Sequence, residues 1–221
     1  MNLGRRHLIV CGTDTDVGKT IVSAWLVQGL DAMYWKPVQS GLEAGGDRGR
    51  VCRLLDLPPE RVLPENYAFQ QPVSPHWAAE QEERWIDPDQ LTLPNVKGPL
   101  VIETAGGLMV PLNRQWLQLD QLQKWNQPVI LVARSGLGTI NHTLLSLEAM
   151  RQRNLNVLGV IFNGTHHPDN PSTIQAFTGV PVIAELPILD QVTAESLARQ
   201  WQLQKLTLWF ERLKDDWSQT R

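Results

Sequence analysis

The sequence predicts a single α/β domain in which helices cover both faces of a mostly parallel sheet. Apolar strand-like runs alternate with helical patterns along most of the 221 residues. Apolar strands in this alternation are typical of a parallel sheet buried between two helical layers. The first apolar run also ends in a glycine-flanked turn that opens a helix, which is the most specific local pattern in the chain.

Each element follows from hydrophobic periodicity and from the residues that end it. A proline-rich stretch, residues 58–99, breaks the strand–helix rhythm. We interpret it as an elaboration over the sheet edge, with a short helix near residues 77–83, inside one domain of residues 1–221. The expected strands are residues 7–11, 33–36, 100–103, 129–132, 157–162 and 182–185, and the expected helices are residues 18–30, 48–55, 119–125, 142–153 and 193–216.

Composition excludes several classes of function. The net charge of −3 gives no sign of a nucleic-acid partner. The two cysteines, Cys11 in a core-like run and Cys52 in a helical stretch, call for no disulfide, so a reducing cytoplasm is the expected compartment. The polar start leads into a run too short for a signal peptide, and no run approaches the roughly 20 apolar residues of a membrane span.

Residues 12–20 read Gly-Thr-Asp-Thr-Asp-Val-Gly-Lys-Thr and lie between the first strand and the first helix. This context predicts a phosphate-binding loop. Free backbone N–H groups at the start of a helix attract anions, and Gly18 lets the backbone approach phosphates closely. Lys19 can reach the β and γ phosphates, and the Thr20 hydroxyl can bind Mg²⁺.

The first glycine of this loop is one residue early, because position 13, where Gly-x-x-x-x-Gly-Lys-Thr needs glycine, is threonine. The loop is therefore a variant that is wider at its first turn. The competing interpretation is that residues 18–20 merely open a helix. The agreement of strand, loop and helix favours the phosphate loop and with it a three-layer architecture like that of P-loop nucleoside triphosphatases.

Three charged residues are candidate site residues at one edge of the sheet, the edge where α/β proteins bind ligands. Lys36 ends the second strand, and Glu103 ends a buried strand, which suggests a Mg²⁺ ligand. A solvated strand-end lysine remains an equal alternative for Lys36. Asp47 precedes a helix, and the residues alone favour a helix N-cap there.

Two further motifs have open interpretations. The glycine-rich turn at residues 136–142 opens a helix and is either a second anion site or a simple cap. By itself, His76 in a Ser-Pro-His sequence is more typical of a packing or surface histidine.

Taken together, these motifs resemble those of the dethiobiotin synthetase family of biotin biosynthesis, over nearly the whole chain up to Leu189. Thr104 stands where the family usually has glycine, and Gly164 stands where an acid is frequent. The matching segments are residues 12–20, 36–41, 46–47, 74–76, 103–107 and 137–142.

The resemblance implies an ATP-dependent cyclo-ligase. One amine of diaminopelargonate takes up CO₂ to give a carbamate, ATP phosphorylates the carbamate, and the second amine attacks the mixed anhydride, which closes the ring of dethiobiotin. Mg²⁺ is the implied cofactor and a cytoplasmic homodimer the implied assembly, with part of the substrate site contributed by the other subunit.

The resemblance also implies the site residues. The catalytic residues are Lys19 and Lys36, and the metal ligands are Thr20, Asp47 and Glu103. The nucleotide residues are Asp16, Val17, Gly18, Lys19, Thr20, Ile21, Asp47, Glu103, Thr104, Ala105, Gly106, Asn163, Gly164, Pro187, Ile188 and Leu189. The substrate residues are Thr15, Lys36, Ser40, Gly138, Thr139, Ile140 and Asn141.

Rival functions share parts of this pattern. A regulatory P-loop ATPase switch of the partition or division-site type can bind membranes through a C-terminal amphipathic helix, and residues 199–217 are amphipathic. Such proteins carry an extra lysine early in the loop, which residues 13–17 lack, and the helix is barely basic. An ATP-dependent amide synthase is a second alternative. A GTPase is disfavoured because no Lys-x-Asp follows Asn163.

Overall fold

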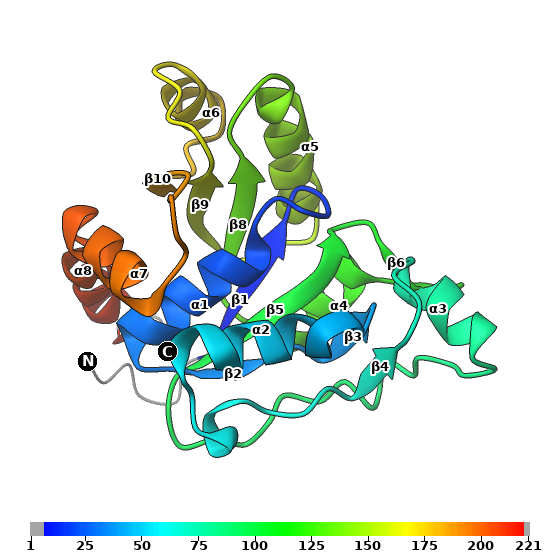
Figure 1. Ribbon diagram of the computed structural model, residues 1–221. Coiled ribbons are helices and arrows are strands. Elements are labelled where there is room, and N and C mark those ends of the chain that lie inside the picture. The colour runs from blue at the N-terminus through cyan, green and yellow to red at the C-terminus, as the bar shows by residue number, and fades with distance from the viewer. Residues whose placement is uncertain (1–6, 219–221) are drawn as a thin grey trace.

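The computed structural model describes residues 7–218, with the side chains of residue 44 and of residues 214–218 left out (Figure 1). Its centre is a six-stranded sheet in which every neighbouring pair of strands is parallel. The predicted fold class is confirmed. The spatial order is β10 (Val182–Leu186), β9 (Val157–Asn163), β8 (Val129–Arg134), β1 (His7–Gly12), β5 (Leu100–Gly107) and β2 (Met33–Trp35).

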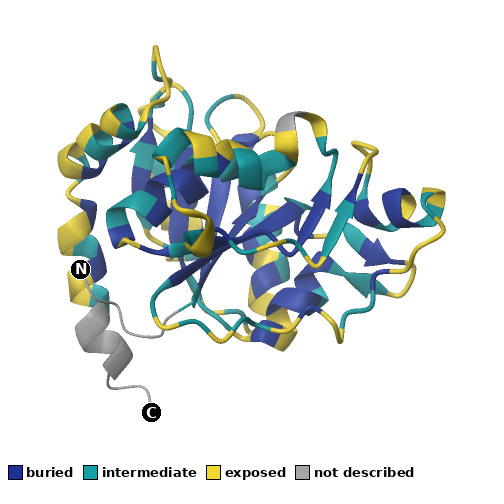
Figure 2. Ribbon diagram, turned by 60° about the horizontal axis from the view of Figure 1, so that its bottom comes forward, coloured by how far each residue is buried: buried dark blue, intermediate teal, exposed yellow. Residues whose placement is uncertain are grey.

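Helices cover both faces of this sheet, and the strands between them are buried (Figure 2). Along β1, Val10 faces one apolar core while Ile9 and Cys11 face the other. The first core lies under α1 (Lys19–Leu30), α2 (Gly46–Leu55), α7 (Ala194–Leu203) and α8 (Leu206–Ser218), and the second under α4 (Gln118–Trp125), α5 (Thr139–Gln152) and α6 (Asn170–Thr178).

The C-terminal helices hold α1 in place through an aromatic cluster. The indole Nε1 of Trp25 donates a hydrogen bond to the Leu197 carbonyl at 2.9 Å, and Trp201 meets Trp25 edge-on. A Cβ at Gly29 would lie 2.3 Å from the Trp201 ring, so glycine is what allows this close approach. The helix that follows the predicted phosphate loop is thus packed between the sheet and α7.

Part of the stretch of residues 58–99 lies along the β2 edge. The short strand β4 (Tyr67–Phe69) pairs in parallel with β3 (Val38–Ser40), and the Leu63 amide donates to the Tyr34 carbonyl on β2 at 2.9 Å. Helix α3 (Pro75–Gln81) and the hairpin of β6 (Pro111–Asn113) and β7 (Trp116–Leu117) complete this region. Short 3-10 turns span Glu43–Gly45 and Pro59–Arg61.

Each predicted strand and helix has a counterpart within a few residues, but one detail of the C-terminal region is wrong. The helical region divides after Leu203, and Lys205 adopts a left-handed φ of 52°. This break shifts the helical phase, so Leu203 is 62% exposed while Leu206 and Phe210 are buried. The side chains of the amphipathic segment beyond residue 213 lie outside the described residues. Within residues 7–218, no helix combines the length and apolar character that crossing a bilayer requires.

Candidate active site

The loop between β1 and α1 owes its shape to its two glycines. A Cβ at Gly12 would lie 2.8 Å from a methyl of Val17, which tucks under the loop, and 2.9 Å from the Asp14 carbonyl. Gly18 has a φ of 96°, and a Cβ there would lie 2.1 Å from Nδ2 of Asn163. Nδ2 of Asn163 in turn donates to the Val17 carbonyl at 3.2 Å. Gly12 thus lets Val17 and the Asp14 carbonyl approach the end of β1 closely, and Gly18 supplies the left-handed backbone at the start of α1.

Lys19 and Thr20 point from the first turn of α1 toward the same side of the loop. The Lys19 ammonium donates to the Asp14 carbonyl at 2.8 Å, and burial lowers the pKa of Lys19, partly offset by the charge of Glu103. The Thr20 hydroxyl donates to Oε1 of Glu103 at 2.9 Å. This contact joins the loop to the end of β5.

A buried lysine lies between two carboxylates at the centre of the site. The Lys36 ammonium donates to Oε1 of Glu103 at 3.2 Å and also forms an ion pair with Oδ2 of Asp47. Burial alone would lower the pKa of Lys36, but the charges of Glu103 and Asp47 outweigh it and raise the pKa. Burial likewise opposes the ionised form of Asp47, yet Lys36 lowers its pKa overall. The solvated interpretation of Lys36 is wrong, since its exposure is only 4%.

Asp47 does not cap α2. The N-cap is Gly45, and Asp47 lies in the first turn with its carboxylate on Lys36. Its backbone amide donates to Oε1 of Gln39 at 3.1 Å, while Nε2 of Gln39 donates to the carbonyls of Ser40 and Gly41. Gln39 therefore ties the start of α2 to the predicted substrate loop. Sequence reasoning missed this residue, because no motif in the sequence marks it.

The oxygen atoms gathered here fit a magnesium ion. Mg²⁺ is usually held by one or two carboxylates, with water and substrate phosphates as its other ligands. Thr20, Asp47 and Glu103 supply a hydroxyl and two carboxylates around the Lys36 ammonium. Among the residues described, no group of three or more His, Cys, Asp or Glu side chains is placed to hold a metal ion.

A cleft of about 980 Å³ opens above these residues. The elaboration forms its far wall through Pro72, Val73, Ser74 and Pro75. The structure brings together most of the predicted nucleotide and substrate residues as its lining. Those residues are Thr15, Asp16, Gly18, Lys19, Thr20, Ile21, Lys36, Ser40, Asp47, Glu103, Ala105 and Gly106.

The other predicted residues do not line this cleft. Val17 and Thr104 are buried beneath it. Asn163 ends β9 and Gly164 follows it, behind the loop, and Pro187, Ile188 and Leu189 follow β10. The predicted substrate turn stands at the start of α5: Gly138 is the N-cap with a φ of 90°, Thr139 is buried, and Ile140 and Asn141 follow in the first turn.

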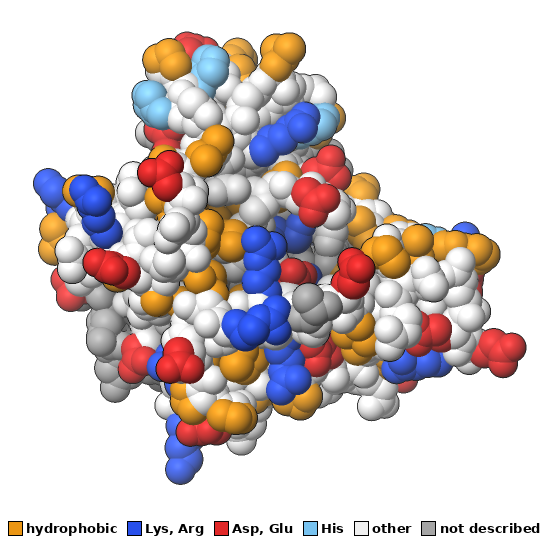
Figure 3. Space-filling model, viewed as in Figure 1, with side chains coloured by type: hydrophobic (Ala, Val, Ile, Leu, Met, Phe, Trp, Pro, Cys, Tyr) orange, Lys and Arg blue, Asp and Glu red, His pale blue; other side chains and the backbone are white. Residues whose placement is uncertain are grey.

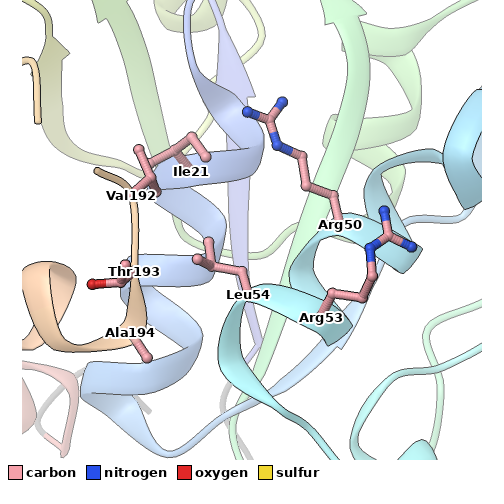
Figure 4. Close-up of a pocket in the computed structure, with 7 residues that line it drawn as sticks. All are labelled: Ile21, Arg50, Arg53, Leu54, Val192, Thr193 and Ala194. Carbon is pink, nitrogen blue, oxygen red and sulfur yellow. The ribbon is translucent and has the colours of Figure 1, made fainter. Parts of the chain in front are cut away.

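Arginine side chains of α2 line a further part of the site, and sequence reasoning did not identify them. On the face shown in Figure 3, Lys and Arg side chains gather over α2, which carries Arg48, Arg50 and Arg53. A smaller pocket of about 440 Å³ joins the cleft at Ile21, Arg50 and Arg53. In Figure 4, Ile21 and Val192 lie on one wall of it and the two arginines on the other. The smaller pocket that adjoins the cleft thus has arginines on one wall and apolar side chains on the other.

Because of the ion pair, the contribution of Asp47 to the free energy of unfolding depends on pH. The pKa of Asp47 is lower in the folded protein, so this contribution is fully present above the unfolded pKa of about 3.9 and is lost as the pH falls through the folded pKa. The side chain is 26% exposed. At pH 7 we therefore expect Asp47→Asn to lower the free energy of unfolding by ~1 kcal/mol, less than the loss from a fully buried pair.

Urea unfolding at several pH values measures this difference. It should be constant from about pH 5 to 8 and shrink below about pH 4. Asp190→Asn, at an exposed carboxylate outside the cluster, controls for loss of one charge. A difference between wild type and Asp47→Asn that does not change with pH would contradict the assignment.

Solved structures share the fold at low sequence identity. The septum site-determining protein MinD of Pyrococcus horikoshii matches with a TM-score of 0.55 and 18% identity, over 97% of this chain and 96% of that one. A plasmid partition protein of Borrelia burgdorferi gives 0.56 and 11% identity, over 94% of this chain and 99% of that one. At such identities these likenesses show the architecture alone.

Sequence relatives are much closer. Residues 6–196 match the family model described as AAA domain. ATP-dependent dethiobiotin synthetase BioD of Rhodopseudomonas palustris (strain BisB18) is 49% identical over 86% of this chain and 91% of its own length, and that of Brucella anthropi is 49% identical over 87% and 91%. Biotin biosynthesis bifunctional protein BioCD of Bordetella avium is 51% identical over 87% of this chain and 42% of its own length. The chain belongs to the ATP-dependent dethiobiotin synthetase family.

Proposed function

We propose that this protein uses ATP and CO₂ to carboxylate and cyclise diaminopelargonate to dethiobiotin, releasing ADP and phosphate. The intermediates are a carbamate and a carbamic–phosphoric anhydride. Its family identifies it as an ATP-dependent ligase of biotin biosynthesis. The observation that supports this carboxylation and cyclisation reaction is the position of the Lys36 ammonium, which is held between two carboxylates beside a phosphate loop.

The nucleotide binds through the loop. Backbone N–H groups at the start of α1 and the Lys19 ammonium contact the phosphates. In this proposal the adenine end is bound by Asn163 and Gly164 at the end of β9 and by Pro187, Ile188 and Leu189 after β10. Thr20, Asp47 and Glu103 hold Mg²⁺, which neutralises charge on the transferred phosphoryl group.

Lys36 is the residue that brings the two anionic reactants together. The γ phosphate and the carbamate repel each other by roughly 4 kcal/mol at about 4 Å and an effective dielectric near 20. An ammonium between them offsets much of this repulsion and favours the crowded transition state over the separated ground state. Since Glu103 and Asp47 raise the pKa of Lys36, its side chain remains a cation throughout the neutral range.

The substrate occupies the part of the cleft lined by Thr15 and Ser40 in this proposal, and the start of α5 of a second subunit completes it. Two observations support a composite site in a homodimer. Gly138, Thr139, Ile140 and Asn141 do not line their own chain's cleft, although the family motif includes them. Beside them, Leu137 is fully exposed and Leu145 is 63% exposed, as expected of a surface that another subunit covers.

ATP turnover in the presence and absence of each reactant tests the reaction. We expect ADP formation only when diaminopelargonate, bicarbonate and Mg²⁺ are all present. Lys19→Ala should lower turnover by roughly 10²-fold or more, because it removes a cation from the phosphoryl group. Lys97→Ala, at an exposed lysine of the elaboration, is the matched control. Turnover that needs ammonia instead of CO₂ would contradict the proposal and favour an amide synthase.

Hybrid dimers test the composite site. Lys19→Ala impairs the loop of one subunit, and Asn141→Ala, carried by the other subunit, impairs the turn that this other subunit lends to its partner. Random exchange makes half of the dimers hybrids with one intact site, so about a quarter of wild-type activity should return.

Mixing Lys19→Ala with Glu103→Gln is the control, because both changes impair the loop side of the site and their hybrids contain no intact site. Mass spectrometry of the mixture establishes that exchange has occurred. If hybrids form and the Lys19→Ala and Asn141→Ala mixture stays inactive, each subunit contains a complete site.

A further inference from the structure

The side chain of Tyr34 ends inside the charge cluster, although no sequence motif singles it out. Tyr34 lies on β2, two residues before Lys36. Its hydroxyl donates to Oε2 of Glu103 at 2.9 Å, and both side chains are completely buried. Lys36 and Thr20 donate to the other oxygen, Oε1. Glu103 thus has one oxygen committed to Tyr34 and one turned toward the cation and the loop.

The ring of Tyr34 holds this hydroxyl in a fixed place. It packs in the apolar core under α1, and β2 pairs in register with β5, with Tyr34 opposite Val101. The Tyr34 hydroxyl is a hydrogen-bond donor, and in the structure it donates to Glu103. A buried carboxylate oxygen needs such a donor, because leaving it unpaired is costly.

We propose that Tyr34 is a positioning residue for the metal site: its hydroxyl fixes the orientation of Glu103 so that Oε1 is the oxygen offered to Mg²⁺. The proposal rests on the proposed function, because it needs Glu103 as a metal ligand. Without the hydroxyl, Oε2 would compete for Lys36 and Thr20, and the carboxylate would no longer have one preferred orientation. Residues that orient a metal ligand typically change metal affinity or activity by about 10- to 100-fold when they are replaced.

Tyr34→Phe keeps the ring and removes the hydroxyl. Calorimetric titration with Mg²⁺ in the presence of ADP, together with ADP titration in EDTA, separates the metal from the nucleotide. We expect the Mg²⁺ dissociation constant to rise by about 10-fold, while ADP binding in EDTA stays unchanged. Turnover should fall at low Mg²⁺ and recover substantially at saturating Mg²⁺, because the ligand set itself is intact.

Tyr67→Phe is the matched control, since the Tyr67 hydroxyl accepts a hydrogen bond from the Asp87 amide, outside the charge cluster. The effect of Tyr34→Phe should also vanish in a Glu103→Gln background, because the hydroxyl acts through that carboxylate. If Tyr34→Phe binds Mg²⁺ as wild type does, Tyr34 has only a packing role. If wild type itself shows no Mg²⁺-dependent nucleotide binding, the proposed function fails, and the Tyr34 proposal with it.

A second measurement does not depend on the folding of Tyr34→Phe. The chain has two tyrosines, so fluorotyrosine incorporated into Tyr67→Phe labels Tyr34 alone. Its fluorine resonance should move when Mg²⁺ is added to the ADP complex and stay in place with ADP in EDTA. A resonance that does not respond to Mg²⁺ would overturn the proposal.

Discussion

The rest of the site depends on one ammonium group, that of Lys36, and on its two carboxylates. The three charges come from different elements, since Lys36 follows β2, Asp47 lies on α2 and Glu103 lies on β5. Buried charges are tolerated only when they are paired, so these elements must be placed correctly relative to one another before the cluster can form. The elaboration contributes to this placement, because it covers the exposed edge of β2 and walls the cleft.

This arrangement also explains how the site can serve anionic reactants. The two carboxylates beside the phosphate loop are both paired with one cation in the structure, the Lys36 ammonium. In the proposed reaction Asp47 and Glu103 would hold Mg²⁺, which would supply positive charge to the phosphates, and the Lys36 ammonium would lie beside the phosphoryl and carbamate oxygens. The Tyr34 hydroxyl donates to the Glu103 carboxylate, and the Gln39 side chain accepts from the backbone amide of Asp47, so both residues contact the segments that carry the carboxylates.

Much of the fold and of the site follows from sequence because parallel strands end at one edge. Apolar strands, the Gly-Lys-Thr turn and the charges after β2 and β5 are local patterns, and topology alone brings them together. Contacts that depend on side-chain orientation were not predictable. Asp47 was expected to be an N-cap, because no local sequence pattern shows that its carboxylate forms an ion pair with Lys36. Tyr34 and Gln39 had no motif to mark them.

Other elements were missed for reasons of length or phase. Strands β3 and β4 have three residues each, too few to show a period. The expected helix of residues 193–216 is divided by the break at Lys205, which no local pattern indicated, and so Leu203 lies on the surface while Leu206 and Phe210 are buried. The adenine residues and the dimer remain predictions, because they concern groups that come from outside this chain.

The central claim is that the Lys36 charge serves turnover and not nucleotide affinity. Lys36→Gln keeps a polar side chain and removes the charge, with Lys97→Gln as the control. The most direct measurement is the ATP dissociation constant beside steady-state turnover for both variants. The account predicts an ATP dissociation constant within about threefold of wild type and a loss of turnover of about 10²-fold or more for Lys36→Gln. Turnover of Lys36→Gln within about threefold of wild type would contradict the account.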